Sequence, residues 1–161
     1  MAPMSLLSWA LWGFVGTVVL STLATIGQGL GLTRMNIPLM LGTMFTPDRD
    51  RGKVVGLAVH LANGWLFSLL YIATFRMLGH AGVLLGGGIG LLHALFVLTV
   101  GMRVLPGLHP RMASEQHGPS VARQLEPPGL LALNYGVRTP IAVIVVHVVY
   151  GMILGGFYHL G

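Results

Sequence analysis

The chain has 161 residues, of which 54% are hydrophobic and 8% are charged, with a formal net charge of +5 and no cysteine. Soluble domains carry roughly 25% charged residues, and a chain this short cannot hide so much apolar surface in one core. The composition therefore excludes an ordinary soluble domain. The absence of cysteine excludes disulfides, thiolate metal sites and thiol nucleophiles.

Four apolar segments are long enough to cross the hydrocarbon core of a bilayer, which is about 30 Å thick and takes about 20 helical residues. They predict an all-α, polytopic membrane protein with the lipid bilayer as its solvent. We expect a single membrane domain, built as a four-transmembrane-helix bundle. The expected spans cover residues 7–32, 53–76, 81–104 and 139–160, and the connecting loops cover 33–52 and 105–138.

Two Thr-Pro pairs indicate where helices begin. Thr46 before Pro47 and Thr139 before Pro140 have the residue types of an N-cap followed by the first helical position. Asp48, which follows the first pair, is expected to cap the second span or to bind a neighbouring basic side chain.

Both long loops contain apolar patches, which a plain linker does not need. The segment "MNIPLMLGTMFTP" is too short to span, so we expect it at the membrane interface or inside the protein. In the second loop, Pro119 is expected to open a short amphipathic helix that Pro127 ends, after which "LLAL" returns to the interface. We interpret both patches as surfaces against headgroups or another protein.

The basic residues indicate an orientation. Only Arg76 lies at the end of the spans opposite the two long loops. Because cytoplasmic loops of membrane proteins are rich in Lys and Arg, we predict cytoplasmic long loops and both termini outside, in the periplasm. Basic residues scattered singly among apolar spans argue against a nucleic-acid partner. On the inside lie Arg34, Arg49, Arg51, Lys53, Arg103, Arg111, Arg123 and Arg138.

Matched residues suggest that the chain contains two tandem helical hairpins. Four residues of the second span recur in the fourth at one offset of 87, and the first and third spans end at Arg34 and Arg103. Such hairpins would be related by an axis along the membrane normal. The Thr-Pro pairs align at a different offset, which weakens the match. The matched residues are Arg51, His60, Gly64 and Tyr71 with Arg138, His147, Gly151 and Tyr158.

Small or polar residues recur at every fourth position of each predicted helix, as in the first-span series Gly13, Thr17, Ser21 and Thr25, near Gln28. Such stripes let helix backbones approach closely in lipid. We expect them to pack the helices within one chain, and homodimerisation or docking to other membrane protein subunits is the alternative. Helix packing is predicted for Gly56, Gly64, Gly86, Gly90, Gly151 and Gly155.

Three histidines lie in the inner-to-middle zone of the predicted spans, and Asn63 lies one turn from the first of them. Polar groups at this depth are costly and usually face the protein interior, so we expect the three rings to approach one another. They are His60, His93 and His147.

Several roles for these histidines stay open. They could hydrogen-bond across helices as neutral rings, or hold haem b, with His60 and His147 as the axial pair. A quinone pocket, a proton relay or a metal site are further alternatives. A metal site lacks any intramembrane carboxylate or thiolate, so no metal ligand is assigned. The other histidines are expected to be solvated; they are His80, His109, His117 and His159.

No predicted span contains an acidic residue, and the sequence has no nucleophile-elbow, P-loop or dinucleotide-binding motif. We therefore assign no catalytic residue and expect a non-enzymatic accessory or structural subunit of a larger respiratory or photosynthetic membrane complex. One alternative is a haem- or quinone-binding redox protein. Another is a small permease with a polar path through Gln28, Asn63 and the histidines.

The segment "MNIPLMLGTMFTPDRDRGKVVGLAVHLANGWLFSLLY", residues 35–71, resembles a group of small, uncharacterised four-helix bacterial integral membrane proteins. The resemblance implies a location in the bacterial inner membrane. It implies no chemistry.

Overall fold

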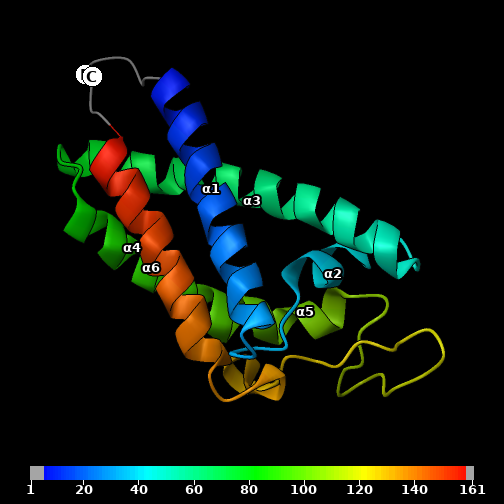
Figure 1. The fold of residues 1–161 in the computed structure, drawn as a ribbon. Helices are drawn as coiled ribbons and strands as arrows, with labels where there is room; N and C mark the ends of the chain where they lie inside the picture. Colours follow the sequence, from blue (N-terminus) through cyan, green and yellow to red (C-terminus); the bar gives the residue numbers. More distant parts are fainter. Residues whose placement is uncertain (1–5, 159–161) are drawn as a thin grey trace.

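The computed structural model describes residues 6–158, and all its named elements are helical (Figure 1). Four helical segments are long and apolar enough to cross a membrane, which confirms the predicted all-α fold with four spans. Short helices α2 and η2 lie in the two long connections. The spans are α1 (Leu6–Gly29), α3 (Arg49–Leu78), the run Val83–Leu108, and α6 (Thr139–Phe157); α2 is Ile37–Gly42 and η2 is Leu130–Tyr135.

The third span is not one regular helix. It consists of α4 (Val83–Phe96), a π-helical stretch η1 (Val97–Gly101) and α5 (Met102–Leu108). A π-helical turn inside a longer helix frequently marks a functional site. Here η1 directly follows the turn of α4 that carries His93.

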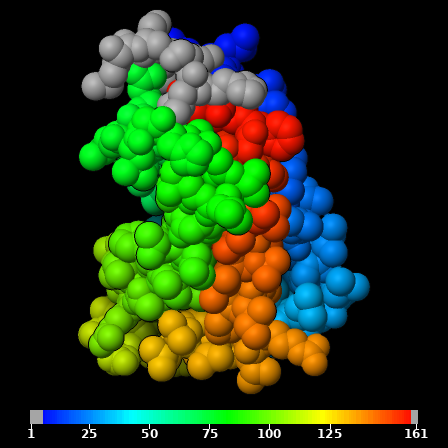
Figure 2. All heavy atoms as spheres, turned by 90° about the vertical axis from the view of Figure 1, so that its left-hand side faces the viewer, coloured from blue at the N-terminus to red at the C-terminus, as the bar shows by residue number. Residues whose placement is uncertain are grey.

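The two ends of the bundle differ in what they carry: one holds the start of α1, the end of α6 and the short α3–α4 turn, and the other holds the long connections. In Figure 1, the start of α1, the end of α6 and the α3–α4 turn lie toward the upper left, whereas α2, α5 and the long connections lie toward the lower right. Figure 2 shows α6 running between α4 and α1 on one face. The predicted grouping of both long loops at one end of the bundle is therefore present in the fold.

The predicted N-cap Thr46 of the second span is wrong, whereas the expectation that Asp48 caps this helix is confirmed. The N-cap of α3 is Asp48, whose Oδ1 accepts hydrogen bonds from the backbone N–H of Asp50 and Arg51, at 3.0 and 2.9 Å. A carboxylate beside the positive helix end is a stronger acceptor than a threonine hydroxyl, and the same bonds lower the pKa of Asp48. The fourth span does begin at Thr139 with Pro140 in its first turn, as predicted, but its N-cap is Arg138, and the Thr139 hydroxyl bonds to Thr33.

The connections also differ from expectation. Residues 119–126 form no helix, so Pro119 does not open one. The "LLAL" segment forms η2, in which Leu131 and Ala132 have φ angles of 51° and 61° and Ala132 is fully buried against the bundle. Left-handed backbone costs about 1–2 kcal/mol per non-glycine residue, and packing of this turn under the helices offsets it.

The apolar segment before α3 does enter the protein. Asn36 caps α2 by accepting a hydrogen bond from the Leu39 N–H at 2.8 Å, and α2 then packs against the first turns of α3. A Cβ on Gly56 would overlap the carbonyl oxygen of Pro38, so the backbones of the two helices touch. The expectation that this segment dips into the protein is confirmed.

The α1–α3 and α4–α6 pairs meet at matching positions. Each contact position on α1 has a counterpart 69 residues later, at or next to the start of α4. Each contact position on α3 has a counterpart 87 residues later, on α6. The hairpins therefore share contact positions, as the duplication hypothesis requires. The matched contacts are Gly13–Ser68 with Gly82–Gly155, and Thr17–Gly64 with Gly86–Gly151.

Two hydrophobic clusters form the core. The cluster near the start of α1 and the end of α6 is rich in aromatic residues, and the cluster near the long loops contains four buried methionines, Met35, Met40, Met102 and Met112. Flexible thioether side chains fill the irregular space between short helices and loops. Between the two clusters the packing leaves a cavity, which residues of both clusters line.

Candidate functional site

A cavity of about 230 Å³ lies in the middle of the bundle, and its lining is mostly apolar. Residues of α1, α2, α3, α4 and α6 form its walls. The exposed members of its lining are Thr25 of α1 with Leu57 and Asn63 of α3. The cavity therefore reaches the surface of the bundle between α1 and α3, at a depth where the surroundings of a membrane helix are lipid.

All three predicted intramembrane histidines line this cavity. The rings of His93 and His147 touch edge to face, with centroids 4.8 Å apart and planes at 83°. His93 also stacks on Phe67 at 4.7 Å. Three histidines from three helices thus converge on one cavity wall.

The hydrogen bond of His147 fixes which of its ring nitrogens carries hydrogen. Nδ1 lies 2.8 Å from the carbonyl oxygen of Val143, one turn earlier in α6. A carbonyl oxygen can only accept, so Nδ1 is the donor. In the neutral ring, Nε2 of His147 is then an acceptor without hydrogen.

His93 has the complementary arrangement. Its Nδ1 lies 3.0 Å from the hydroxyl of Tyr71 in α3. The tyrosine hydroxyl has no other acceptor among residues 6–158, so donation to Nδ1 satisfies its hydrogen. Nε2 of His93 then carries hydrogen and is a donor.

His60 and Asn63 are less well satisfied. Nε2 of His60 is buried, and the described residues offer it no hydrogen-bond partner. No described residue hydrogen-bonds to the side-chain amide of Asn63, although that amide lies within the span of α3. Buried unpaired atoms also occur at Trp65 and Tyr158, but neither residue lines the cavity.

The α1 wall of the cavity carries a row of hydroxyl groups. Thr17, Ser21 and Thr25 each donate to the carbonyl oxygen four residues earlier, at 2.7, 2.7 and 2.9 Å. Their hydrogens are therefore used within the helix, and the oxygens keep lone pairs for an outside donor. Because residues four apart rise about 6 Å, the row extends along one face of α1.

Tyr150 closes the cavity toward the end of the bundle where α1 begins and α6 ends. Its hydroxyl donates to the carbonyl oxygen of Gly64 at 2.5 Å, and its ring packs edge to face on Tyr71. Sequence reasoning missed Tyr150 and Phe67 as lining residues. The spacing held a signal, because Tyr150 follows His147 by three residues and shares its helix face.

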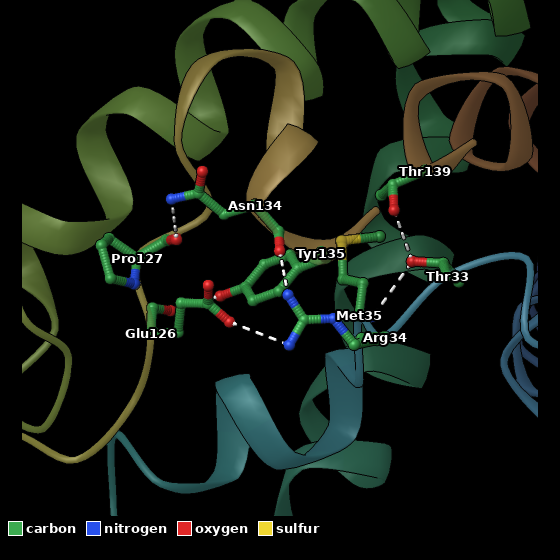
Figure 3. A network of polar contacts seen from close by, with 8 residues as sticks. All are labelled: Thr33, Arg34, Met35, Glu126, Pro127, Asn134, Tyr135 and Thr139. Atoms are coloured by element: carbon green, nitrogen blue, oxygen red, sulfur yellow. Dashed lines mark hydrogen bonds and ion pairs between the residues drawn. The ribbon is translucent and has the colours of Figure 1, made fainter. Parts of the chain in front are cut away.

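A polar network holds the end of the cavity nearest the long loops (Figure 3). Thr33, which lines the cavity, hydrogen-bonds to Thr139 at 2.7 Å and so joins the end of α1 to the start of α6. Arg34 donates to the carbonyl oxygen of Asn134 and lies 3.4 Å from the Glu126 carboxylate. The Tyr135 hydroxyl donates to the Glu126 carbonyl oxygen at 2.6 Å.

Burial raises the pKa of Tyr135, the Glu126 charge raises it further, and the Arg34 charge opposes the shift. The phenol therefore stays protonated and keeps its hydrogen for the Glu126 carbonyl group. This network connects two loops that are about a hundred residues apart in sequence.

His109 is not solvated as predicted, since it is only 1% exposed. Its Nε2 lies 2.8 Å from the Met40 carbonyl oxygen in α2, and its Nδ1 accepts from the Arg111 N–H at 3.0 Å. Burial lowers the pKa of His109, the bond to Met40 opposes this, and the charges of Arg111 and Arg123 lower the pKa further. A neutral His109 therefore fastens α2, which forms part of the cavity floor.

The remaining predicted site residues lie elsewhere. His80 and His117 are exposed, and His159 lies outside the described residues. Gly56 contacts α2 and Gly64 contacts Thr17 of α1. The other four glycines lie where α4 and α6 meet; they are Gly86, Gly90, Gly151 and Gly155.

Two features bear on haem and metal binding. The predicted axial pair is His60 and His147, but the cavity between them is small beside the roughly 300–1,000 Å³ of pockets for drug-sized ligands, and the ring of His93 already touches that of His147. Within residues 6–158, no group of three His, Cys, Asp or Glu side chains could hold a metal ion. The geometry suits a single ring or similar small group.

No protein-family model, curated protein or solved structure matches this chain.

Proposed function

We propose that this chain is a non-enzymatic, multi-pass membrane protein that holds a small, lipid-soluble ligand in the cavity between α1, α3 and α6. The observation that carries the proposal is the unpaired Nε2 of His60, which is buried in a residue that lines an apolar cavity. An unsatisfied polar group in the interior of a membrane protein costs several kcal/mol. A ligand with one polar group would remove that cost.

The size and lining of the cavity support a ligand with a single ring rather than a haem. Leu57 and Thr25 at the opening are exposed on the flank of the bundle, so a ligand dissolved in the bilayer has direct access. A tail attached to the ring could leave through the same opening. Quinone-class compounds have this combination of a polar ring and an apolar tail.

The proposed location follows from the distribution of charge. We propose a bacterial inner-membrane protein with the two long loops in the cytoplasm and both termini in the periplasm, because the loops and the span ends next to them carry eight of the nine basic residues. The resemblance of residues 35–71 to small bacterial membrane proteins agrees with this proposal.

A role as an accessory subunit stays a prediction and does not conflict with ligand binding. A pocket that opens to the bilayer could deliver its ligand to an adjacent membrane protein. A purified protein that remains monodisperse without a co-purifying partner would count against the subunit role and leave the ligand-binding role intact.

Filling the cavity tests the proposal. Ala24 lines the cavity on α1, whereas Ala58 is exposed on α3 and does not line it, so Ala24→Phe and Ala58→Phe form a matched pair. The thermal unfolding midpoint is measured in lipid nanodiscs with tetramethylhydroquinone and with 2-methyl-1,4-naphthoquinone. At a free concentration of a hundred times Kd, binding contributes about 2.7 kcal/mol of stability.

We expect at least one compound to raise the midpoint of the unsubstituted protein and of Ala58→Phe, but not of Ala24→Phe. If neither compound stabilises the unsubstituted protein, or if Ala24→Phe responds equally, the proposal is wrong.

A further inference from the structure

The cavity presents hydrogen-bond acceptors that only a ligand with its own hydrogen can satisfy, beside the donors of His93, Asn63 and Gln28. We propose that its ligand is a hydrogen-bond donor: a lipid-soluble hydroxylated ring of the phenol or quinol class, in preference to the corresponding quinone. This inference rests on the proposed ligand-binding function and specifies the chemistry of that ligand.

The hydroxyl row of the α1 wall supplies only acceptors, whereas the Gln28 amide, whose Oε1 accepts from Asn36, keeps its N–H groups as donors. The hydroxyl hydrogens of Ser21 and Thr25 are donated to backbone carbonyl oxygens within α1, so each oxygen presents lone pairs and no hydrogen. A ligand hydroxyl can donate to such an oxygen. A quinone carbonyl group cannot, and its lone pairs would instead face those of the wall.

The histidine pair, whose rings are in contact, adds one acceptor and one donor. Nε2 of His147 lacks hydrogen because Nδ1 donates to Val143, and Nε2 of His93 carries hydrogen because Nδ1 accepts from Tyr71. A hydroxyl oxygen can donate to the first nitrogen and accept from the second. A carbonyl oxygen can satisfy only His93 and would leave the His147 nitrogen unpaired.

His60 supplies a further unpaired nitrogen. It is the counterpart of His147 at an offset of 87 residues, and it lines the same cavity. Two equivalent histidines from two matching hairpins suit a ring with two opposed hydroxyl groups. Phe67 and Tyr150 supply aromatic surface in the same lining, which favours a ring over an aliphatic alcohol.

Three compounds separate donor from acceptor recognition without any redox step. Tetramethylhydroquinone donates and accepts, while duroquinone has nearly the same size and only accepts. The dimethyl ether of the hydroquinone also accepts but cannot donate. Binding of each is measured by titration calorimetry on the purified protein in nanodiscs, under argon so that the hydroquinone stays reduced.

We expect the hydroquinone to bind at least about tenfold more tightly than either of the other compounds, because a site left with unpaired polar groups rejects the analogue that cannot pair them. Equal binding of all three compounds, or tighter binding of duroquinone, overturns this inference while the proposed function stands. Absence of binding by all three overturns both.

A matched pair of variants locates the recognition. Thr25→Val removes the hydroxyl group of a residue that lines the cavity. Thr22→Val removes a hydroxyl group that also donates to the carbonyl oxygen four residues earlier, but Thr22 does not line the cavity. We expect Thr25→Val to weaken hydroquinone binding by about threefold to tenfold and to leave ether binding unchanged. Thr22→Val should change neither. Equal effects of the two substitutions would refute a role for the α1 wall.

Discussion

Replacing Gly86 by alanine should weaken the bundle where α4 and α6 touch through their backbones. A Cβ on Gly86 would overlap the carbonyl oxygen of Gly151, and no side chain lies between them that could rotate away. Because carbon and oxygen atoms in contact lie about 3.3–3.6 Å apart, the helices would have to separate by roughly 1 Å. The close packing of small residues that drives helix association in lipid would then be lost along this line of contact.

The expected magnitude follows from two opposing terms. Alanine gains about 0.5–1 kcal/mol over glycine within a helix, whereas overpacking a tight contact costs about 1–3 kcal/mol. Since only backbone movement can relieve this overlap, we expect a net loss of roughly 1–2 kcal/mol. Gly88→Ala is the control, because Gly88 lies on the same helix and is exposed, and a Cβ there would have no neighbour within 4 Å.

The measurement is reversible unfolding in mixed micelles, titrated with dodecyl sulfate and followed by tryptophan fluorescence. Gly88→Ala should match or slightly exceed the stability of the unsubstituted protein, and Gly86→Ala should fall below it. A Gly86→Ala protein as stable as Gly88→Ala would refute the backbone contact between α4 and α6.

Two further predictions concern the end of the bundle that carries the long loops. Because burial lowers the pKa of His109 below 6.5, the unfolded chain binds more protons there, so this stabilising contribution is present above pH 6.5 and is lost as the pH falls. The thermal midpoint of the unsubstituted protein should therefore exceed that of His109→Gln at pH 7.5, and the difference should shrink toward pH 5; a constant difference would contradict this. The ion pair of Arg34 and Glu126 has side chains 69% and 47% exposed, so Glu126→Gln should cost less than about 1 kcal/mol of unfolding free energy. Tyr135→Phe removes a 2.6 Å hydrogen bond and should cost about 1 kcal/mol of unfolding free energy. If Glu126→Gln lowers the unfolding free energy by more than Tyr135→Phe does, the carboxylate contributes more than its exposure implies.

The four spans could be predicted because lipid leaves few solutions to a chain of this composition. A segment of about 20 apolar residues must satisfy its backbone internally, and a helix does so whatever its neighbours are. Helix ends carry less information. Thr46 and Asp48 are both acceptable caps, and only the path of the preceding chain places the Asp48 carboxylate over the first N–H groups of α3.

The burial of His109 could not be predicted from local sequence. It depends on the Met40 carbonyl oxygen, 69 residues earlier, and on a position in α2 that only the docking of α2 on α3 defines. The π-helical stretch after His93 is equally hidden, because "VLTVG" is an ordinary apolar helix sequence. The convergence of three histidines could be expected from their depths, but the hydrogen bonds that distinguish His93 from His147 depend on the three-dimensional packing of α3, α4 and α6.

The polar residues of the spans divide into two groups, and the division itself points to a ligand. Where the chain can satisfy a polar side chain internally it does so, as the α1 hydroxyl groups, Tyr71 and Tyr150 show. Among the exceptions, Trp65 and Tyr158 lie away from the cavity, whereas His60 and Asn63 line the cavity that opens on the flank of the bundle. A role in packing alone gives no reason to leave these two unpaired at the cavity while satisfying their neighbours, because leucine at either position would fill the same space without a desolvation cost. A ligand that pairs with them gives such a reason.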